Sequence, residues 1–390
     1  MSETLIILGA SARAAAFSAL RAGYRPVCGD WFADDDLQAV CPVKQIERYP
    51  AELAEVAAAA PAGAWLYTGG LENYPSLVDR VSRTRPLLGV AGRALRRVRD
   101  PLLVARTLRR AGLAAPECRE TSARLPTDGS WLLKGRRSSG GGEVLAWRGG
   151  QAFQAKRGWY FQQRIEGVSQ AAVFVAAGGE ARLAGVTEQL LAPSQNPLPL
   201  GEGDVDAFRY AGSMGPLSLS ARLRERFEQI GNVLAREFDL AGLFGVDCIV
   251  AGEDVRPVEV NPRYTASVEV LEWATGMRAI AMHVAACREK TLPRAIPTPA
   301  PEAWFGKRVV YFRPAPGIDG VKITAELAAE WQQCNTNSTW PVVADLPGAG
   351  AKLAAGQPVF TLFASAADRQ TLCQKLARDE AIWQARLAPK

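Results

Sequence analysis

The chain has 390 residues, 48% of them apolar and 22% charged, and carries a net charge of +6. At about 150 residues per domain this length predicts two to three domains, and the composition is typical of a soluble globular protein. No run of about 18 uninterrupted apolar residues occurs, which argues against a membrane-spanning helix. The cysteines stand singly, which favours reduced thiols and a cytoplasmic location over a disulfide framework.

Histidine occurs once, as His283, within an apolar stretch of helical spacing. We expect a structural role for it, and a single histidine excludes multi-histidine metal sites. Positive charge is densest among the arginines between Arg93 and Arg110. This pattern favours a cleft for anionic substrates, with a nucleic-acid surface as the alternative.

The first 95 residues predict an open α/β sheet. An apolar run at 5–8 is followed by Gly9, a helix over 14–20 and a second strand over 26–30. The turn between Gly9 and Arg13 is not a GxGxxG motif, so a dinucleotide site is not supported. Ser11 and Arg13 at the helix N-terminus are candidates for holding an anionic substrate, and a plain tight turn is the alternative.

A strand over 65–68 ends in two glycines, and Glu72 and Asn73 follow it. Ligands of open α/β sheets lie beyond such strand ends, so we interpret both residues as candidate substrate contacts or as helix caps. Later elements, in chain order, are a helix over 100–111, strands over 131–134, 143–147, 160–165, 171–176 and 181–190, helices over 223–238 and 267–275, a proline-rich linker after 293, strands over 307–312 and 358–363, and a helix over 367–376.

Lys134 and the glycine-rich segment after it predict a phosphate site. The residues Ser138, Ser139, Gly140, Gly141 and Gly142 form a loop whose backbone N–H groups can approach phosphate oxygens closely. A lysine just before such a loop adds a point charge. A plain flexible loop is the alternative, and the sequence has no P-loop motif.

Asp247, Glu259 and Asn261 predict a divalent-cation site. Glu259 and Asn261 lie two apart and share one strand face. If the preceding strand forms a hairpin centred on Glu253, Asp247 lies directly opposite Glu259. An all-oxygen set suits Mg²⁺ shared with nucleotide phosphates, and a chance cluster on a solvated face is the alternative. Arg263 follows at the next position of the same face and is suited to clamp a transferring phosphoryl group.

Together these segments resemble the ATP-grasp superfamily of ATP-dependent carboxylate–amine ligases. The resemblance covers roughly residues 1–295, and the Glu-x-Asn-Pro-Arg run at 259–263 is its most specific part. It implies an α/β (α+β) ATP-grasp fold with an N-terminal open α/β, Rossmann-like domain over 1–95, nucleotide-binding and catalytic domains over 96–295, and a small C-terminal α+β unit over 296–390.

The resemblance also implies roles for these residues. Lys134 and the glycine loop would contact ATP, and the segment Gln162, Gln163, Arg164 and Ile165 would hold the adenine. Asp247, Glu259 and Asn261 would bind Mg²⁺, while Arg263 and Lys134 would act in catalysis. Gln163 and Gln170 stand where glutamates are common, and Arg99-Asp100 stands where a second lysine is usual, so Arg97 or Arg99 is its candidate replacement.

A finer resemblance links the chain to a branch that includes tyramine–glutamate ligases of methanofuran synthesis and ATP-grasp proteins of tetrahydromethanopterin biosynthesis. It is carried by residues 9–13, Asp30, 208–212 and 261–264, and it adds Arg209 and Tyr264 as candidate substrate contacts.

The implied activity joins a small-molecule carboxylate to an amine through an acyl phosphate, with ATP and Mg²⁺ and with neither nucleic acid nor a membrane as partner. A homodimer is possible. A non-catalytic ATP-binding scaffold is the alternative function.

Overall fold

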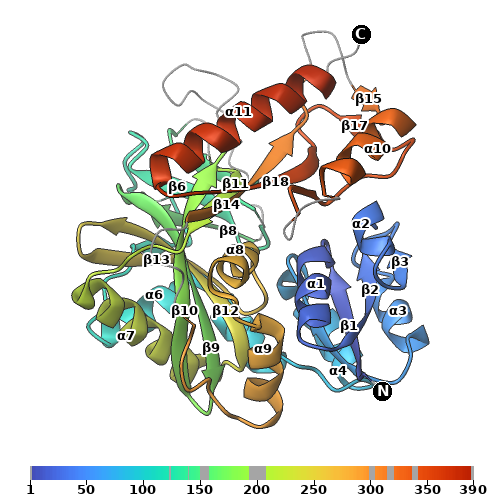
Figure 1. The fold of residues 1–390 in the computed structure, drawn as a ribbon. Helices are drawn as coiled ribbons and strands as arrows, with labels where there is room; N and C mark the ends of the chain where they lie inside the picture. Colours follow the sequence, from blue (N-terminus) through green and yellow to red (C-terminus); the bar gives the residue numbers. More distant parts are fainter. Residues whose placement is uncertain are drawn as a thin grey trace.

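The computed structural model describes residues 2–122, 124–138, 140–149, 158–192, 208–297, 304–313, 320–335 and 341–387. The N-terminal part is a parallel sheet in the order β3-β2-β1-β4 (Figure 1). Its strands are β1 (Thr4–Gly9), β2 (Arg25–Asp30), β3 (Val43–Gln45) and β4 (Ala64–Tyr67). Residues 5–8 are fully buried because helices cover both faces of such a sheet. These helices are α1 (Arg13–Arg21), α2 (Asp35–Gln38), α3 (Leu53–Ala59), η1 (Leu71–Asn73) and α4 (Pro75–Ser82).

A small antiparallel sheet follows, in the order β5-β8-β6-β7. Asp100 begins the helix before it, because its Oδ1 accepts hydrogen bonds from the N–H groups of Leu102 and Leu103 and Pro101 occupies the first helical position. Trp131, Trp147 and Phe161 form the core of the sheet. The elements are α5 (Gly92–Val98), α6 (Pro101–Arg110), β5 (Cys118–Arg119), β6 (Trp131–Gly135), β7 (Val144–Ala146) and β8 (Trp159–Gln163).

The largest sheet has the order β13-β12-β9-β10-β11-β14-β18-β16. Its strands are β9 (Val168–Ala177), β10 (Glu180–Leu191), β11 (Tyr210–Gly215), β12 (Gly242–Ala251), β13 (Asp254–Asn261), β14 (Trp304–Tyr311), β16 (Val343–Ala344) and β18 (Pro358–Ala366). Strands from the last quarter of the chain therefore continue the sheet that begins at Val168. The domain boundaries 1–95, 96–295 and 296–390 stay predictions.

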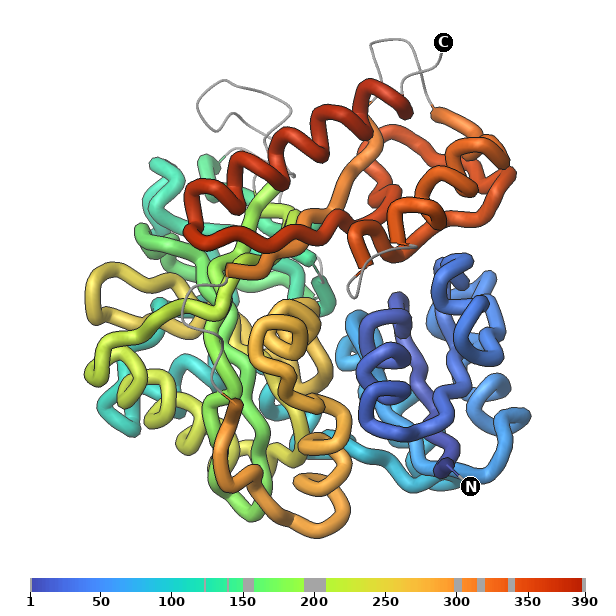
Figure 2. The backbone as a smooth tube through the Cα atoms, viewed as in Figure 1, coloured from blue at the N-terminus to red at the C-terminus, as the bar shows by residue number. Residues whose placement is uncertain are grey.

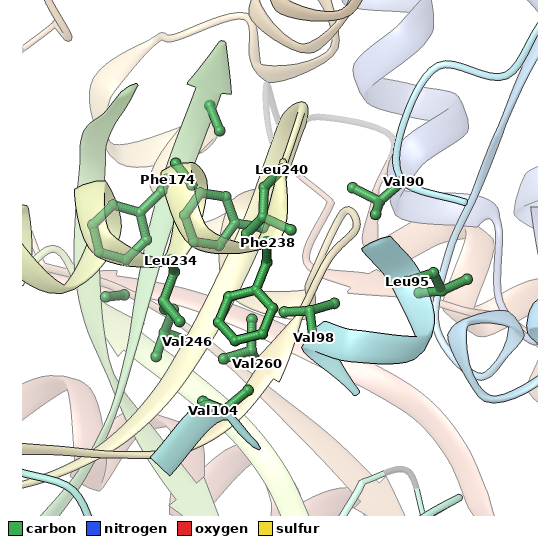
Figure 3. Packing of buried hydrophobic residues seen from close by; sticks show 14 of the residues in the cluster. Val90, Leu95, Val98, Val104, Phe174, Leu234, Phe238, Leu240, Val246 and Val260 are labelled. Atoms are coloured by element: carbon green, nitrogen blue, oxygen red, sulfur yellow. The ribbon is translucent and has the colours of Figure 1, made fainter. Parts of the chain in front are cut away.

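Helices cover both faces of this sheet. Phe174 packs with α7 (Ala221–Phe238), and its neighbour Val175 packs on the other face with α8 (Ala266–Thr275) and α9 (Ala279–Arg288), as the alternation of a strand requires. In Figure 3 Phe174 and Val246 of the sheet lie beside Leu234 and Phe238 of α7. The same cluster reaches α5 and α6, so one core joins the sheet to the helices before the small sheet.

The C-terminal part lies across one end of the molecule and extends over the N-terminal part (Figure 2). It contains β15 (Gly320–Lys322), α10 (Ala325–Cys334), β17 (Lys352–Ala354) and α11 (Arg369–Leu387), and Trp331, Phe360 and Trp383 form its core. The N–H of Asp35 donates to the carbonyl of Leu346, which ties this part to α2.

The structure confirms the predicted mixed α/β fold and most predicted elements. The final helix is longer than expected, because buried Leu376, Trp383 and Leu387 continue its apolar face beyond the predicted end. Among the described residues, none of the helices has the length and apolarity needed to cross a membrane.

Candidate active site

The hairpin of β12 and β13 brings the predicted metal ligands together. Asp247 pairs with Glu259 and Gly245 pairs with Asn261, so the predicted opposition of the two acids is confirmed. The predicted turn is wrong, because Ala251 pairs with Asp254 and the hairpin is not centred on Glu253. A register shift after Asp247 inserts one extra residue in β13 and restores the predicted pairing.

Asp247 and Glu259 have different electrostatic surroundings. Burial raises the pKa of Asp247 to about 7, and the charge of Glu259 adds to the rise. Within the described part of the chain its oxygens accept from two neutral donors, Gln189 Nε2 at 2.9 Å and Asn261 Nδ2 at 3.1 Å. Burial also works against the charge of Glu259, but Arg99 and Lys134 outweigh it and lower the pKa of Glu259.

The donor set fits Mg²⁺. It consists of two carboxylates and one amide oxygen, which leaves positions for water or phosphate oxygens, as is usual for Mg²⁺. The raised pKa of Asp247 marks a buried carboxyl whose burial outweighs the nearby charges of Arg263 and Lys134, and a divalent ion would add the missing positive charge. The described residues contain no cluster of three or more His, Cys, Asp or Glu side chains suited to a metal, so a site here depends on Asn261 and on the ligand itself.

A pocket opens between the small sheet and β13. Lys134 Nζ donates to Gln162 Oε1 at 3.1 Å, and Gln162 Nε2 donates to the carbonyl of Val258 at 3.2 Å, which links the two walls. The pocket is mostly apolar at the helix side and polar near Glu259. It is lined by Val98, Arg99, Pro101, Val104, Ala105, Pro116, Cys118, Lys134, Gly135, Arg136, Ser138, Gly141, Val144, Tyr160, Gln162, Pro257, Val258, Glu259 and Val260.

The glycine loop contributes Ser138 and Gly141 to the lining of this pocket and packs against residues 208–210. Gly140 and Gly141 have φ angles of +65° and +77°, which only glycine adopts without strain. The N–H of Tyr210 donates to the carbonyl of Gly140 at 3.0 Å. A Cβ on Gly141 would lie 1.9 Å from the Phe208 carbonyl oxygen. Ser139, which we expect in the same phosphate site, lies outside the described residues.

Two arginines stand beside the acid pair. Arg99 Nη1 donates to Glu259 Oε1 at 2.9 Å, and Arg263 Nη2 donates to Asn261 Oδ1 at 3.3 Å. Arg97 packs instead over the ring of Phe238, 5.4 Å from its centroid. Of the two candidates for the missing lysine, the structure therefore brings Arg99 into the pocket and places Arg97 elsewhere. Sequence reasoning could not separate them, because the end of α5 decides which side chain faces β13.

The turn after β1 is filled by a carboxylate from the chain itself. Asp30 accepts hydrogen bonds from the N–H groups of Ala12, Phe32 and Ala33. The side chain of Arg13 is buried and paired with Glu269 and Asp345. Ser11 is exposed, and its carbonyl accepts a hydrogen bond from Thr68. The expectation that Arg13 holds an external anion is therefore corrected, since an internal acid occupies the turn and Arg13 joins three parts of the chain. A substrate role for Ser11 stays a prediction.

Tyr264 is likewise structural. It is buried, and its hydroxyl donates to Glu272 Oε2 at 3.2 Å, which corrects the expected substrate contact. Glu72 is buried and forms an ion pair with Arg263 at 2.7 Å, so it meets the site through that arginine. Arg209 Nη1 donates to the carbonyl of Gly356 at 2.8 Å and lies over the ring of Tyr311. A substrate role for Arg209 stays a prediction.

The residues expected to hold adenine divide into two groups. Gln162 lines the pocket, whereas Gln163, Arg164 and Ile165 follow it at the end of β8 outside the lining set. Gln163 Oε1 accepts a long hydrogen bond of 3.4 Å from the N–H of Glu117. Gln170 pairs with Cys248 and so lies on the sheet face opposite Asp247. Their nucleotide roles stay predictions.

His283 has the expected structural role. Its Nδ1 accepts a hydrogen bond from the N–H of Leu243 at 2.8 Å, and its Nε2 lies 3.1 Å from the carbonyl of Leu88. Burial lowers the pKa of His283 to about 4, so the ring is neutral at physiological pH.

Comparison with known proteins agrees with this geometry. Residues 98–267 match the ATP-grasp domain family. The carbamoyl phosphate synthase large chain of Myxococcus xanthus is 36% identical over 102 residues, which are 26% of this chain and 9% of that protein. A second such large chain, from Rubrobacter xylanophilus, is 29% identical over 97 residues, again 9% of its length. The matched segment thus spans about a tenth of these curated relatives.

Solved structures are similar over nearly the whole chain. An N5-carboxyaminoimidazole ribonucleotide synthetase in complex with ADP has a TM-score of 0.69 at 15% identity, covering 98% of this chain and 97% of that one. An L-amino acid ligase from Bacillus licheniformis has a TM-score of 0.68 at 14% identity, covering 98% and 97%. A biotin carboxylase from Campylobacter jejuni has a TM-score of 0.68 at 14% identity, covering 96% and 91%. The predicted ATP-grasp fold is thereby confirmed, and residues 98–267 match the ATP-grasp domain family. The predicted activity as an ATP-dependent ligase stays a proposal.

Proposed function

We propose that the protein is an ATP-dependent carboxylate–amine ligase that forms an amide through an acyl phosphate. One observation carries the proposal: the cations Lys134 and Arg99 line the same pocket as Glu259, and Glu259 faces Asp247. A triphosphate with its adenine in the apolar part of the pocket would place its phosphates between these cations and the acid pair.

The reaction has two balanced steps. A carboxylate oxygen of the first substrate attacks the γ-phosphorus of ATP, the bond to the β-phosphate oxygen breaks, and ADP leaves. The amine nitrogen then attacks the carbonyl carbon, inorganic phosphate leaves with the C–O bond pair, and the nitrogen loses a proton to water. Both steps need positioning and positive charge more than acid–base groups, which fits a site without histidine.

Residues of the chain would divide this work. Asp247, Glu259 and Asn261 would hold Mg²⁺, which neutralises phosphate charge when bound. Arg263, beside Asn261, would stabilise charge on the transferring phosphoryl group. The docked glycine loop would exclude water from the acyl phosphate.

The proposed substrates are a small-molecule acid and a small-molecule amine, with neither nucleic acid nor a membrane as partner. We further propose biosynthesis of a one-carbon-carrier cofactor of the methanofuran or tetrahydromethanopterin type. This finer assignment rests on the sequence resemblance alone, and two of its residues, Arg13 and Tyr264, serve packing between parts of the chain. The seven free cysteines support a reducing, cytoplasmic location. A homodimer is tested by light scattering after size-exclusion chromatography.

The test is ADP release from ATP and Mg²⁺ with a panel of acids and amines, followed by mass spectrometry of the products. Acid-dependent and amine-dependent ADP release, with one amide product, is the expected result. Glu259→Gln should abolish it. Equal rates in both proteins would refute the metal assignment.

A non-catalytic ATP-binding scaffold is the second candidate. The observation that favours it is the ion pair of Arg99 with Glu259, which neutralises one of the two acids without any metal. Tight ADP binding that is insensitive to Mg²⁺, without turnover over the whole panel, would support the scaffold over the ligase.

A further inference from the structure

Two neighbouring residues of the N-terminal part are buried in contact with Arg99 and Arg263, the arginines beside the candidate metal ligands. Glu72 and Asn73 lie on η1, directly after Gly70, whose φ of +92° turns the chain. They are 1% and 6% exposed. Their substrate contact stays a prediction, and the contacts that the structure gives them are with two arginines.

Each of them holds one arginine. Glu72 Oε1 lies 2.7 Å from Arg263 Nη2, and Asn73 Oδ1 accepts from Arg99 Nη2 at 2.9 Å. Each arginine also contacts one of the candidate metal ligands Asp247, Glu259 and Asn261. Arg263 contacts Asn261, and Arg99 contacts Glu259. The N-terminal part therefore reaches the candidate metal ligands through two guanidinium groups.

Arg263 is fixed from the N-terminal side. Its guanidinium carbon would lie 3.5 Å from a Cβ on Gly69, so the backbone at Gly69 passes close to the guanidinium. The second terminal nitrogen of Arg263, Nη1, donates to the Tyr264 carbonyl at 3.1 Å, so both ends of the guanidinium are held. Arg263 is only 12% exposed, so its charge needs a nearby acid, and Glu72 supplies it.

Without Glu72, the charge of Arg263 would still be attracted by the two acids of the candidate metal site. Asp247 and Glu259 both sense the charge of Arg263, since that charge lowers the pKa of each. A buried guanidinium that loses its carboxylate partner turns to other carboxylates because an unpaired buried charge is costly. In that position Arg263 would compete with a divalent cation for the same two acids.

We propose that Glu72 is a positioning residue that holds Arg263 away from Asp247 and Glu259 and so keeps this pair free for Mg²⁺. The inference rests on the proposed metal role of the two acids. It assigns to the N-terminal part a direct influence on metal binding in the ATP-grasp domain.

The experiment measures ADP binding by isothermal titration calorimetry over a series of Mg²⁺ concentrations. In Glu72→Gln, the Mg²⁺ concentration that gives half of the maximal gain in ADP affinity should rise about 5- to 10-fold. A change of this size lies within the range of coupling energies measured between contacting residues. Arg263→Met should abolish this sensitivity, so the double variant should behave as Arg263→Met alone. Glu72→Asp keeps the charge on a shorter side chain and should give a smaller shift, which covers the case that Glu72→Gln does not fold.

Glu380→Gln is the matched control, because Glu380 is also buried and paired with an arginine, Arg308, but belongs to the C-terminal part of the chain. It should leave the Mg²⁺ dependence unchanged. An unshifted midpoint in Glu72→Gln, or an equal shift in the Arg263→Met background, overturns the inference while leaving the ligase proposal intact. If ADP binding to the wild-type protein does not depend on Mg²⁺, both the inference on Glu72 and the ligase proposal are refuted.

Discussion

Asp247 and Glu259 face each other across β12 and β13, yet among the described residues only Glu259 has a cationic partner within hydrogen-bond distance. Arg99 neutralises Glu259. The side chains that donate to Asp247 are instead the amides of Gln189 and Asn261. This asymmetry leaves Asp247 with a raised pKa and with room for a positive charge. It also means that the two acids contribute differently when a metal ion and a nucleotide enter.

The first prediction concerns the acid pair. Glu259→Gln and Asp247→Asn should each weaken Mg²⁺-dependent ADP binding about 10- to 100-fold, because a metal loses one charged ligand. Calorimetry with and without Mg²⁺ measures the effect. Asp254→Asn, on the same hairpin but in a surface ion pair with Arg256, is the control and should bind as the wild type does. Unchanged Mg²⁺ dependence in both site variants would contradict the assignment.

The second prediction separates Arg99 from Arg97. Arg99 lines the pocket, and Arg97 packs over Phe238. Arg99→Met should weaken ADP binding about tenfold, since a charge-assisted hydrogen bond contributes roughly 1.5–3 kcal/mol. Arg97→Met should leave binding unchanged and reduce stability slightly. Equal losses in the two variants would show that general positive charge, rather than position, matters.

The third prediction concerns the glycine loop. Gly141→Ala adds a Cβ that would collide with the Phe208 carbonyl, whereas a Cβ on Gly140 meets no atom within 4 Å. Both positions have positive φ, which costs an alanine roughly 1 kcal/mol. Gly141→Ala should therefore raise the KM for ATP clearly more than Gly140→Ala does. A steady-state ATP titration in the ligase assay tests the order, and the reverse order would show that docking against Phe208 is unimportant.

The sequence was sufficient to predict the geometry of the candidate site where spacing within one strand or hairpin decides it. Glu259 and Asn261 share a face because strands alternate, and Asp247 follows from pairing. The predicted centre of the hairpin turn is wrong by half a residue, but the bulge in β13 restores the pairing of Asp247 with Glu259. The same local reasoning identified α7 and the pocket wall around Lys134.

The sequence alone does not predict ion pairs between segments that lie far apart along the chain. Arg13 looked like an anion site because a helix begins there, but its partners Glu269 and Asp345 lie about 250 and 330 residues later. Glu72 was expected to meet a substrate, and its partner Arg263 is supplied by another part of the chain. Nothing in a single sequence indicates which charged residues will neutralise one another, so Arg13 was misread as a binding group.

The fourth prediction follows from that correction. Arg13→Met leaves Glu269 buried with Lys307 as its remaining cationic partner, at 3.1 Å. Breaking a buried pair costs about 3–5 kcal/mol, so the free energy of unfolding in urea should fall by this order. Arg96→Met, which removes a surface pair with Asp79, should change it little. A stable Arg13→Met protein with impaired substrate binding would restore the original interpretation.

The fifth prediction uses the single histidine. The pKa of His283 is lowered to about 4 by burial, against 6.5 for a free imidazole. Between these two pH values His283 is protonated in the unfolded chain but not in the folded chain. The free energy of unfolding therefore falls as the pH drops from about 6.5 toward 4. At pH 5 this linkage amounts to about 2 kcal/mol.

His283→Gln cannot titrate, although it loses the hydrogen bond to Leu243 or Leu88 and should be less stable at pH 7.5. Between pH 7.5 and pH 5 its free energy of unfolding should decline less than that of the wild type by the same amount. Urea unfolding at both pH values, followed by tryptophan fluorescence, gives the two differences. Parallel declines would mean that His283 is protonated in the folded protein, and that its Nδ1 does not accept from the N–H of Leu243.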